Sequence, residues 1–202
     1  MLAFAATTAT ITTHEVQPAE TYVQNLADRL SGVLASSKPE ADKEREIRTM
    51  IDGDLDGDAI AKYTLGALWK TATPEEFKEF VSLLKEYAST FYEGRLNEYG
   101  GAKVGVTGSV ANGKKAVIVG STISNLKDSD PVQIDWLVVR SGESFKLVDF
   151  RFQGIWIARS WGDQFASIVG NSGGKFAALN SHLKQQIAGG TTNGKGVSGA
   201  AH

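Results

Sequence analysis

The chain has no cysteine, no long apolar run and no excess charge of one sign, and each absence excludes a class of function. Without cysteine there are no disulfide bonds, thiolate metal sites or cysteine nucleophiles. A formal net charge of -2 provides no basic face for nucleic acid or for an anionic membrane. No apolar segment approaches the roughly 20 residues that span a bilayer, so we expect no stable membrane insertion.

Histidine is also scarce, and none of the three histidines is placed as a general base. His14 and His202 lie in the terminal segments, and His182 lies on an expected helix beside Lys184. A Ser-His-Asp hydrolase would need His182 as its base, and its neighbours do not support that role. We therefore predict no catalytic residues.

Two motif-like stretches lack the residues that their chemistry requires. The run from Asp52 to Gly57 fits the first half of a calcium-binding loop, but Tyr63 occupies the position of the bidentate glutamate. We interpret this run as a turn whose aspartates cap the next helix. The glycine pairs form neither a G-x-G-x-x-G motif nor a P-loop. We expect no metal, no nucleotide and no cofactor.

The two ends of the chain differ in composition from the region between them. Residues 2–6, Leu-Ala-Phe-Ala-Ala, match the end of a secretory signal whose upstream regions are missing. Residues 189–202 are rich in glycine, serine and threonine, which is typical of a disordered tail. We expect disordered tails at 1–17 and 189–202, and a single domain at 18–188.

Apolar residues recur at helical spacing in the first half of the chain. The stripe from Tyr22 to Leu34 predicts one helix, and a second, charged helix is expected from Glu40. A third is predicted over 58–69, with an aspartate as its cap. The clearest signal is the sequence at 73–76, Thr-Pro-Glu-Glu, which is a capping box with proline at the first helical position. The helix that it opens is expected to run to about Tyr99.

After Gly101 the apolar pattern changes from helical spacing to alternation. Four strands are predicted, at 104–110, 116–124, 132–140 and 145–152. Their short connections make neighbouring strands antiparallel. From about Ile157 the helical spacing returns for two final helices. This order of elements, helices, then a meander of strands, then helices, predicts an α+β fold.

Two carboxylates within the predicted strands mark where an active site would be expected. Asp135 alternates with Ile134 and Trp136, and Asp149 precedes Phe150. If the apolar residues face inward, both carboxylates face outward, which argues against a buried proton-shuttling base. The large apolar residues around them predict an extensive apolar interior. Spacing alone leaves a filled core and a hollow ligand site equally open.

The segment over 58–76, DAIAKYTLGALWKTATPEE, resembles the signature of the MlaC family, also called toluene-tolerance auxiliary proteins. These are the periplasmic phospholipid-binding components of an ABC lipid-transport system. The resemblance continues over 95–99 and 146–150 and covers about residues 20–187. It departs at 153–158, Gln-Gly-Ile-Trp-Ile-Ala, which is bulkier and more apolar than the family pattern. The hopanoid-associated, HpnM-like branch shares the signature.

The resemblance implies a curved four-stranded antiparallel sheet of NTF2/cystatin-like type, packed by N-terminal and C-terminal helices and enclosing an apolar pocket for acyl chains. It implies a carrier, not an enzyme, that passes phospholipid between an outer-membrane lipoprotein complex and an inner-membrane permease complex. We predict a pocket lined by the apolar side chains Tyr63, Leu68, Phe80, Leu84, Phe91, Val117, Val119, Ile134, Trp136, Val138, Phe150, Phe152, Ile155 and Ile157.

Three alternatives stay open at the level of the sequence. The chain is also compatible with a carrier for hopanoid or another isoprenoid lipid. An isomerase-like enzyme on a cone-shaped sheet would require a buried carboxylate. A helper protein would have a filled core.

Overall fold

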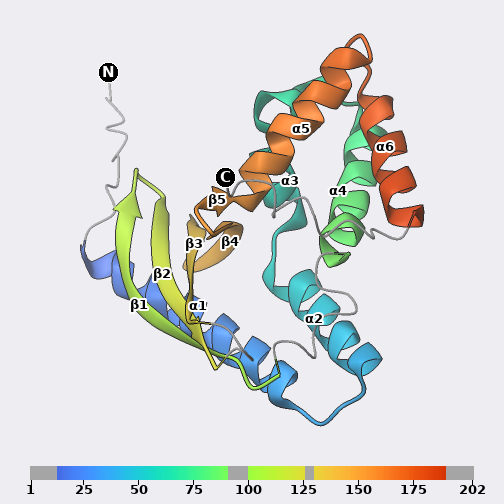
Figure 1. The fold of residues 1–202 in the computed structure, drawn as a ribbon. Helices are drawn as coiled ribbons and strands as arrows, with labels where there is room; N and C mark the ends of the chain where they lie inside the picture. Colours follow the sequence, from blue (N-terminus) through green and yellow to red (C-terminus); the bar gives the residue numbers. More distant parts are fainter. Residues whose placement is uncertain (1–12, 91–99, 126–129, 190–202) are drawn as a thin grey trace, which may run out of the picture. The chain divides into compact units, whose positions relative to one another are not determined.

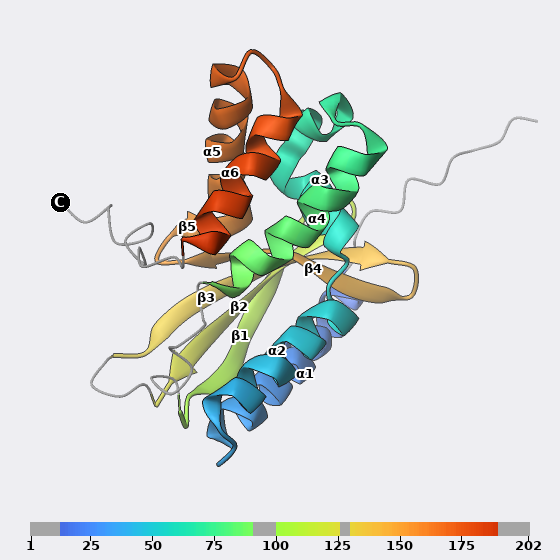
Figure 2. The same cartoon turned by 90° about the vertical axis from the view of Figure 1, so that its right-hand side faces the viewer.

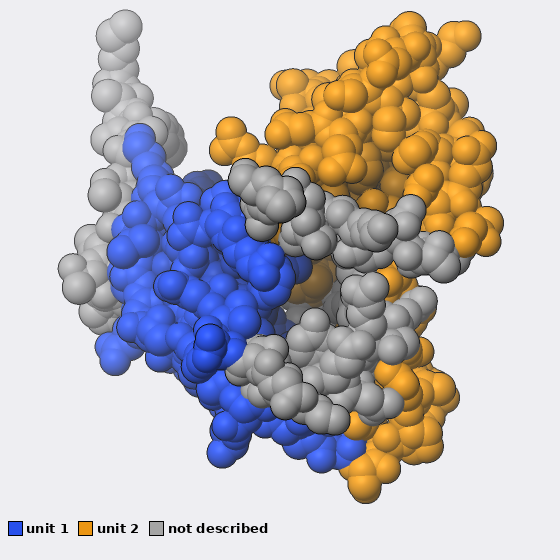
Figure 3. All heavy atoms as spheres, viewed as in Figure 1, with its two compact units in different colours: residues 1–36, 99–156 blue, residues 37–98, 157–202 orange. Residues whose placement is uncertain are grey.

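The computed structural model describes residues 13–90, 100–125 and 130–189, which form two compact units (Figure 3). Unit 1 comprises residues 1–36 and 99–156, and unit 2 comprises residues 37–98 and 157–202. Each unit is therefore built from two separate stretches of chain, and the chain passes from one unit to the other three times.

Unit 1 consists of one helix and an antiparallel sheet in which the strands follow one another in chain order. Its elements are α1 (Thr13–Ala35), β1 (Lys103–Asn112), β2 (Ala116–Ser124), β3 (Val132–Ser141), β4 (Ser144–Phe152) and β5 (Ile155–Trp156). The four predicted strands and the α+β class are confirmed. The fifth strand was not predicted, because two residues are too few to show an alternating pattern.

The β4–β5 connection explains why the chain folds back after the last predicted strand. Phe152 pairs with Ile155, so the turn consists of Gln153 and Gly154. Both turn residues have positive φ, 49° and 81°, as in the type I′ turns that suit the twist of a two-residue hairpin. Glycine adopts this conformation without strain, whereas a residue such as Gln153 does so at some cost.

Helix α1 packs on the sheet and contacts β1, β2 and β4. Figure 1 shows it in blue, running across the strongly curved strands β1 and β2. Its buried stripe includes Ala19, Val23 and Ala27, at the four-residue spacing of one helical face. The helix begins at Thr13, so residues 13–17, assigned to a tail from the sequence, are helical in the structure.

A side-chain amide also joins α1 to the edge of the sheet. The Gln24 Nε2 group donates to the Val104 carbonyl at 3.3 Å, and its Oε1 accepts the Val106 N–H at 3.0 Å. Strand β1 is an edge strand, and unpaired edge groups can pair with other chains. Gln24 therefore satisfies two polar groups of this edge and fixes the helix against it.

Unit 2 is formed by helices. They are α2 (Glu40–Asp54), α3 (Gly57–Leu65), the 3-10 helix η1 (Gly66–Thr71), α4 (Pro74–Ser89), α5 (Ile157–Asn171) and α6 (Phe176–Ala188). Contacts join α4 to α6, α5 to α6, and α3 to both α4 and α5. Figure 2 shows α4, α5 and α6 side by side.

Two helix boundaries differ from those predicted. The third helix changes to 3-10 geometry at Gly66, whose φ of 55° a continuing α-helix does not allow. Helix α4 ends at Ser89, with Thr90 at its C-cap, whereas the apolar pattern predicted one helix to about Tyr99. The remainder of that prediction, residues 91–99, lies outside the described residues. The predicted pocket residue Phe91 lies there as well.

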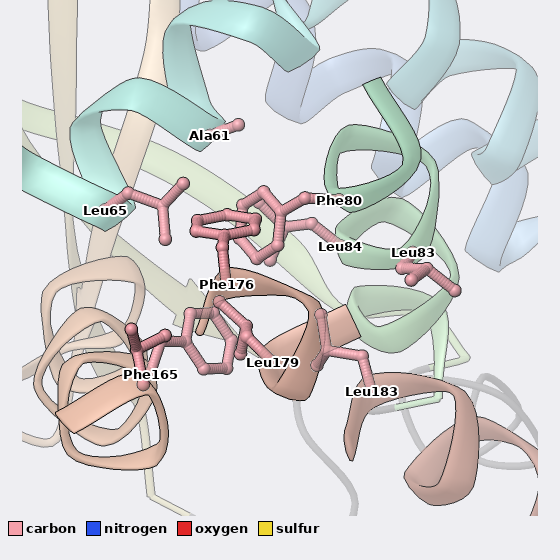
Figure 4. Close-up of a cluster of buried hydrophobic side chains, with 10 residues drawn as sticks. Ala61, Leu65, Phe80, Leu83, Leu84, Phe165, Phe176, Leu179 and Leu183 are labelled. Carbon is pink, nitrogen blue, oxygen red and sulfur yellow. The ribbon is translucent and has the colours of Figure 1, made fainter. Parts of the chain in front are cut away.

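The core of unit 2 is built around Phe80 on α4. Its ring makes edge contacts with Phe165 and Phe176, at centroid distances of 5.7 and 5.8 Å. Figure 4 shows these rings with leucines that point toward them from α3, α4 and α6. Edge-to-face packing of this kind adds about 0.5–1.5 kcal/mol per pair beyond burial.

Helices α3 and α5 make one unusually close approach within this unit. A Cβ atom placed on Gly162 of α5 would lie 2.1 Å from the Thr64 carbonyl oxygen of α3. Only a residue without a side chain fits at this distance. The position of Gly162 therefore determines how closely these two helices pack.

The capping box predicted for α4 is present and gives a testable stability effect. The Thr73 Oγ1 accepts the Glu76 N–H at 3.2 Å, and the Glu76 Oε2 accepts the Thr73 N–H at 2.9 Å. We expect Thr73→Ala to lower the free energy of unfolding by about 1 kcal/mol, measured by urea denaturation. Thr73→Ser retains the acceptor and should retain most of the stability. An equal loss in both variants would contradict this role of the hydroxyl.

Candidate functional site

The pairing register of the sheet places one set of predicted pocket residues on a single face. Directly opposed residues in antiparallel strands point to the same side. Along β2, β3 and β4 the opposed sets are Val117, Val138 and Leu147, then Val119, Trp136 and Phe150, then Ser121, Ile134 and Phe152. We call these nine residues the apolar face. It contains all seven pocket residues predicted on strands β2 to β4.

Helix α1 lies on this same side of the sheet. Ser109 of β1 pairs with Val119 and donates a hydrogen bond to the Glu20 carboxylate of α1, at 2.6 Å. Val117 and Val138, which are opposed to each other at one end of the face, are fully buried. This part of the apolar face is therefore sealed core.

The apolar face becomes accessible toward β4. Phe150 is 36% exposed, although it is paired with the nearly buried Trp136. Their ring centroids are 6.3 Å apart, with planes inclined at 39°. A large aromatic ring exposed beside a buried one makes this end of the face the strongest candidate for contact with an apolar ligand.

One member of the apolar face is polar and was not predicted. Ser121 is fully buried, and its Oγ accepts the Trp136 indole N–H at 2.7 Å. The same Oγ donates to the Ile134 carbonyl at 3.2 Å. A serine at an inward position of a valine-rich strand is the sequence signal that would have indicated this contact.

The opposite face of the sheet carries an ordinary ion pair. Asp135 is opposed to Arg151, which is opposed in turn to Trp156. The Asp135 Oδ2 accepts from the Arg151 guanidinium at 2.5 and 2.8 Å, and the guanidinium lies 5.2 Å from the centre of the Trp156 ring. Asp135 thus faces away from Trp136, as predicted, and its carboxylate is engaged structurally.

Asp149 faces away from Phe150, as predicted, but the conclusion that it is therefore not buried is wrong. Asp149 does lie opposite Leu137, on the face away from Phe150, but it is only 3% exposed. A bulge places Val148 as an extra residue between the pairs of Leu137 and Val138, and Leu137 and Val148 are buried too. The Asp149 Oδ1 accepts the Phe150 N–H at 2.8 Å. Alternation indicates which face a residue occupies, but it does not show whether that face is covered.

The remaining predicted pocket residues have varied surroundings. Phe80 and Leu84 belong to the buried core of unit 2, and Leu68 packs against that core. Tyr63 on α3 is exposed. Ile157 is buried at the start of α5, and in unit 1 Ile155 is half-buried in β5. Their role as pocket lining stays a prediction.

Among the described residues, two groups with clearly shifted pKa values belong to unit 2. Burial raises the pKa of the Tyr87 phenol, whose ring packs 5.2 Å from that of Trp161. Hydrogen bonds from Lys184 and then from Asn180 hold the pKa of Glu79 below its usual 4.5. These contacts join α4 to α6.

The lowered pKa of Glu79 predicts a pH-dependent part of the stability. The ionised carboxylate is stabilised in the folded protein, so its contribution is complete above pH 4.5 and is lost as the pH falls through the lowered value. We expect acid to destabilise the wild type more than Glu79→Gln or Lys184→Met, as measured by urea unfolding at about pH 7 and about pH 3. The difference should be small, because the side chains of this pair are about half exposed. If the stability of both variants depended on pH as that of the wild type does, the proposed contribution of the Glu79 carboxylate would be contradicted.

Neither a membrane span nor a metal cluster is found in the described parts of the chain. No helix within them is long and apolar enough to cross a bilayer. No three histidine or acidic side chains in residues 13–90, 100–125 and 130–189 are grouped to hold a metal ion. Asp56, from the calcium-loop-like run, instead caps α3 by accepting the Ala59 N–H at 3.0 Å.

These features define an α+β protein with an open, curved antiparallel sheet and an accessible aromatic end on one apolar face. The chain belongs to the MlaC family, because the family model described as MlaC protein matches residues 24–185. This confirms the resemblance found in the sequence.

Among solved structures, the fold is similar to that of a phospholipid-binding protein from Ralstonia solanacearum, determined in complex with a phospholipid. The two are 22% identical, and the TM-score is 0.75 over 85% of this chain and 98% of the other. At this identity, the similarity establishes the fold. A search of curated proteins finds no match.

Proposed function

We propose that this protein is a periplasmic phospholipid-binding carrier, which receives and releases lipid at an outer-membrane lipoprotein complex and an inner-membrane permease complex. Membership of the MlaC family supports the proposal, as does the phospholipid bound by the structurally similar Ralstonia solanacearum protein. We assign no catalytic role, cofactor or metal to this function.

The structural observation that carries the proposal is the accessible end of the apolar face. Acyl chains need an apolar surface from which water is excluded, and each buried methylene contributes about 0.8 kcal/mol relative to water. Phe150 provides such a surface, next to Trp136 and on the same face as a buried valine core. We infer that the acyl chains contact this end of the face.

A carrier also has to release its lipid, and an apolar contact surface permits this. The chains move from one dry environment to another when a carrier exchanges lipid with a bilayer or a partner protein. The difference in free energy is then much smaller than transfer from water would suggest. A charged clamp for the headgroup is not required for such exchange.

Lipid extraction from the purified protein is the direct test. We expect organic extraction and native mass spectrometry to recover phospholipid in near-stoichiometric amount. Protein stripped of lipid should take it up again from phospholipid vesicles. Recovery of hopanoid or another isoprenoid would replace phospholipid by that class, and protein that is lipid-free and takes up none would overturn the proposal.

The isomerase alternative is supported by one observation, the burial of Asp149. Because its Oδ1 accepts the neighbouring Phe150 N–H, the carboxylate has a structural role that requires no substrate. Asp149→Asn separates the two functions, since it removes the negative charge while it keeps an oxygen acceptor. If the carrier function is correct, lipid uptake by Asp149→Asn should match that of the wild type.

A further inference from the structure

Ser121 is a polar residue on a face that is otherwise apolar. It follows Val117 and Val119 at alternate positions of β2, and all three side chains are fully buried. A buried hydroxyl costs free energy unless it is hydrogen-bonded. A third valine at this position would avoid that cost, so the contacts of the serine explain what it contributes.

The two hydrogen bonds of Ser121 act in sequence. Its hydroxyl donates to the Ile134 carbonyl at 3.2 Å, and the oxygen accepts the Trp136 indole N–H at 2.7 Å. Indole has a single N–H, so this bond uses the only polar group of the ring. Ile134 and Trp136 both belong to β3, which is paired along its length with β2. The ring orientation is therefore fixed by a rigid part of the sheet.

The ring held in this way lies beside Phe150, at the accessible end of the apolar face. Trp136 is 8% exposed, and its ring centre lies 6.3 Å from that of Phe150. Any ligand that covers Phe150 meets the indole as the adjoining wall. If the indole turned to another rotamer, its N–H would lose its acceptor, and the shape of this wall would change.

We propose that Ser121 is a positioning residue that holds the Trp136 indole as a fixed wall for the acyl chains of a phospholipid, and that this wall determines which chain lengths are accepted. The inference rests on the proposed phospholipid-binding function and deepens it. Ser121 itself acts through Trp136, and Trp136 makes the contact with the lipid.

The first test compares the lipids carried by variants of the full chain. Ser121→Ala removes the acceptor without adding volume, and Ser121→Thr retains it. We expect Ser121→Ala to bind a similar amount of phospholipid, within about twofold, but with a broader distribution of acyl-chain lengths in the extracted lipid. Ser121→Thr should keep the wild-type distribution. An unchanged distribution in Ser121→Ala would overturn the positioning role.

A double variant distinguishes positioning from a general loss of stability. Trp136→Phe keeps an aromatic ring but has no N–H to hold. In that background Ser121→Ala should not change the chain-length distribution any further, because the contact through which it acts is already absent. Equal additional broadening by Ser121→Ala in both backgrounds would mean that it acts by another route, and the inference would fail.

The second test locates the acyl chains with phospholipid brominated on those chains, which quenches the fluorescence of nearby tryptophans. The chain has four tryptophans. Trp136→Phe should remove most of the quenching. Trp156→Phe is the matched control, because the Trp156 side chain lies on the opposite face of the same sheet, next to the Arg151 guanidinium. It should leave most of the quenching intact.

The outcomes distinguish lipid binding itself from the role of Trp136 in it. If the wild type takes up brominated lipid and Trp136→Phe is quenched as strongly as the wild type, lipid binding stands but Trp136 is not its wall. If the wild type takes up no lipid, as judged by both extraction and quenching, the proposed function and this inference are overturned together.

Discussion

Gly162→Ala is expected to destabilise the protein more than alanine at any other glycine in the described residues of unit 2. The new Cβ would lie 2.1 Å from the Thr64 carbonyl oxygen, so α3 and α5 would have to move apart. The clash is with backbone, which cannot rotate away as a side chain can. Overpacking of this kind costs about 1–3 kcal/mol, and we expect the upper end of that range.

The same helix provides a matched control for this prediction. A Cβ on Gly170 of α5 would meet no atom within 4 Å. Alanine has a higher helix propensity than glycine, so Gly170→Ala should be neutral or should stabilise by up to about 0.5 kcal/mol. Thermal unfolding measures both variants, and a loss of about 3 kcal/mol corresponds to a fall in Tm of roughly 6–12 °C. Similar Tm values for the two variants would contradict the close approach.

Phe150→Glu is expected to have the largest effect on lipid binding. In the lipid-free protein the new carboxylate can reach water, because the side chain at this position is about one-third exposed. When acyl chains cover the position, the charge must be desolvated. An effective penalty of about 3 kcal/mol would lower the lipid affinity about 100-fold. The folded protein should persist, with little phospholipid in the extract.

Val110→Glu controls for the change of charge. Val110 is 61% exposed and pairs with Ile118, which is opposed to Leu137 and therefore lies on the face of the sheet away from Phe150. The Val110→Glu substitution introduces the same charge on the same sheet, and it should leave the lipid content of the protein unchanged. Equal loss of lipid in both variants would show that Phe150 has no specific contact with the acyl chains.

The elements that could be predicted from the sequence are those set by local chemistry. The alternation of β2 and the capping box at Thr73 depend on residues close together in the chain, and the structure reproduces them. The signature over 58–76 correctly indicated the family. The fold class followed from the order of these elements.

The features that were missed depend on contacts between distant parts of the chain. Alternation placed Asp149 on the correct face but did not show that this face is covered or that Val148 forms a bulge. The role of Ser121 depends on the register between β2 and β3, which brings its hydroxyl to the Trp136 indole. The close approach at Gly162 depends on how α3 and α5 pack. Local periodicity contains none of this information.

The division of both units into separate stretches of chain has a consequence for biosynthesis. Helix α1 is synthesised long before the strands that cover its apolar stripe, and Gln24 bonds to Val104 across 80 residues. In unit 2, α4 likewise precedes α5 and α6. Large sequence separations of this kind carry an entropic cost of loop closure before any contact compensates for it. We therefore expect unit 1 to complete its folding only after β5 is available, and unit 2 only after α5 and α6 are available. In ribosome-bound chains truncated before α5, the segments of unit 2 should remain sensitive to protease.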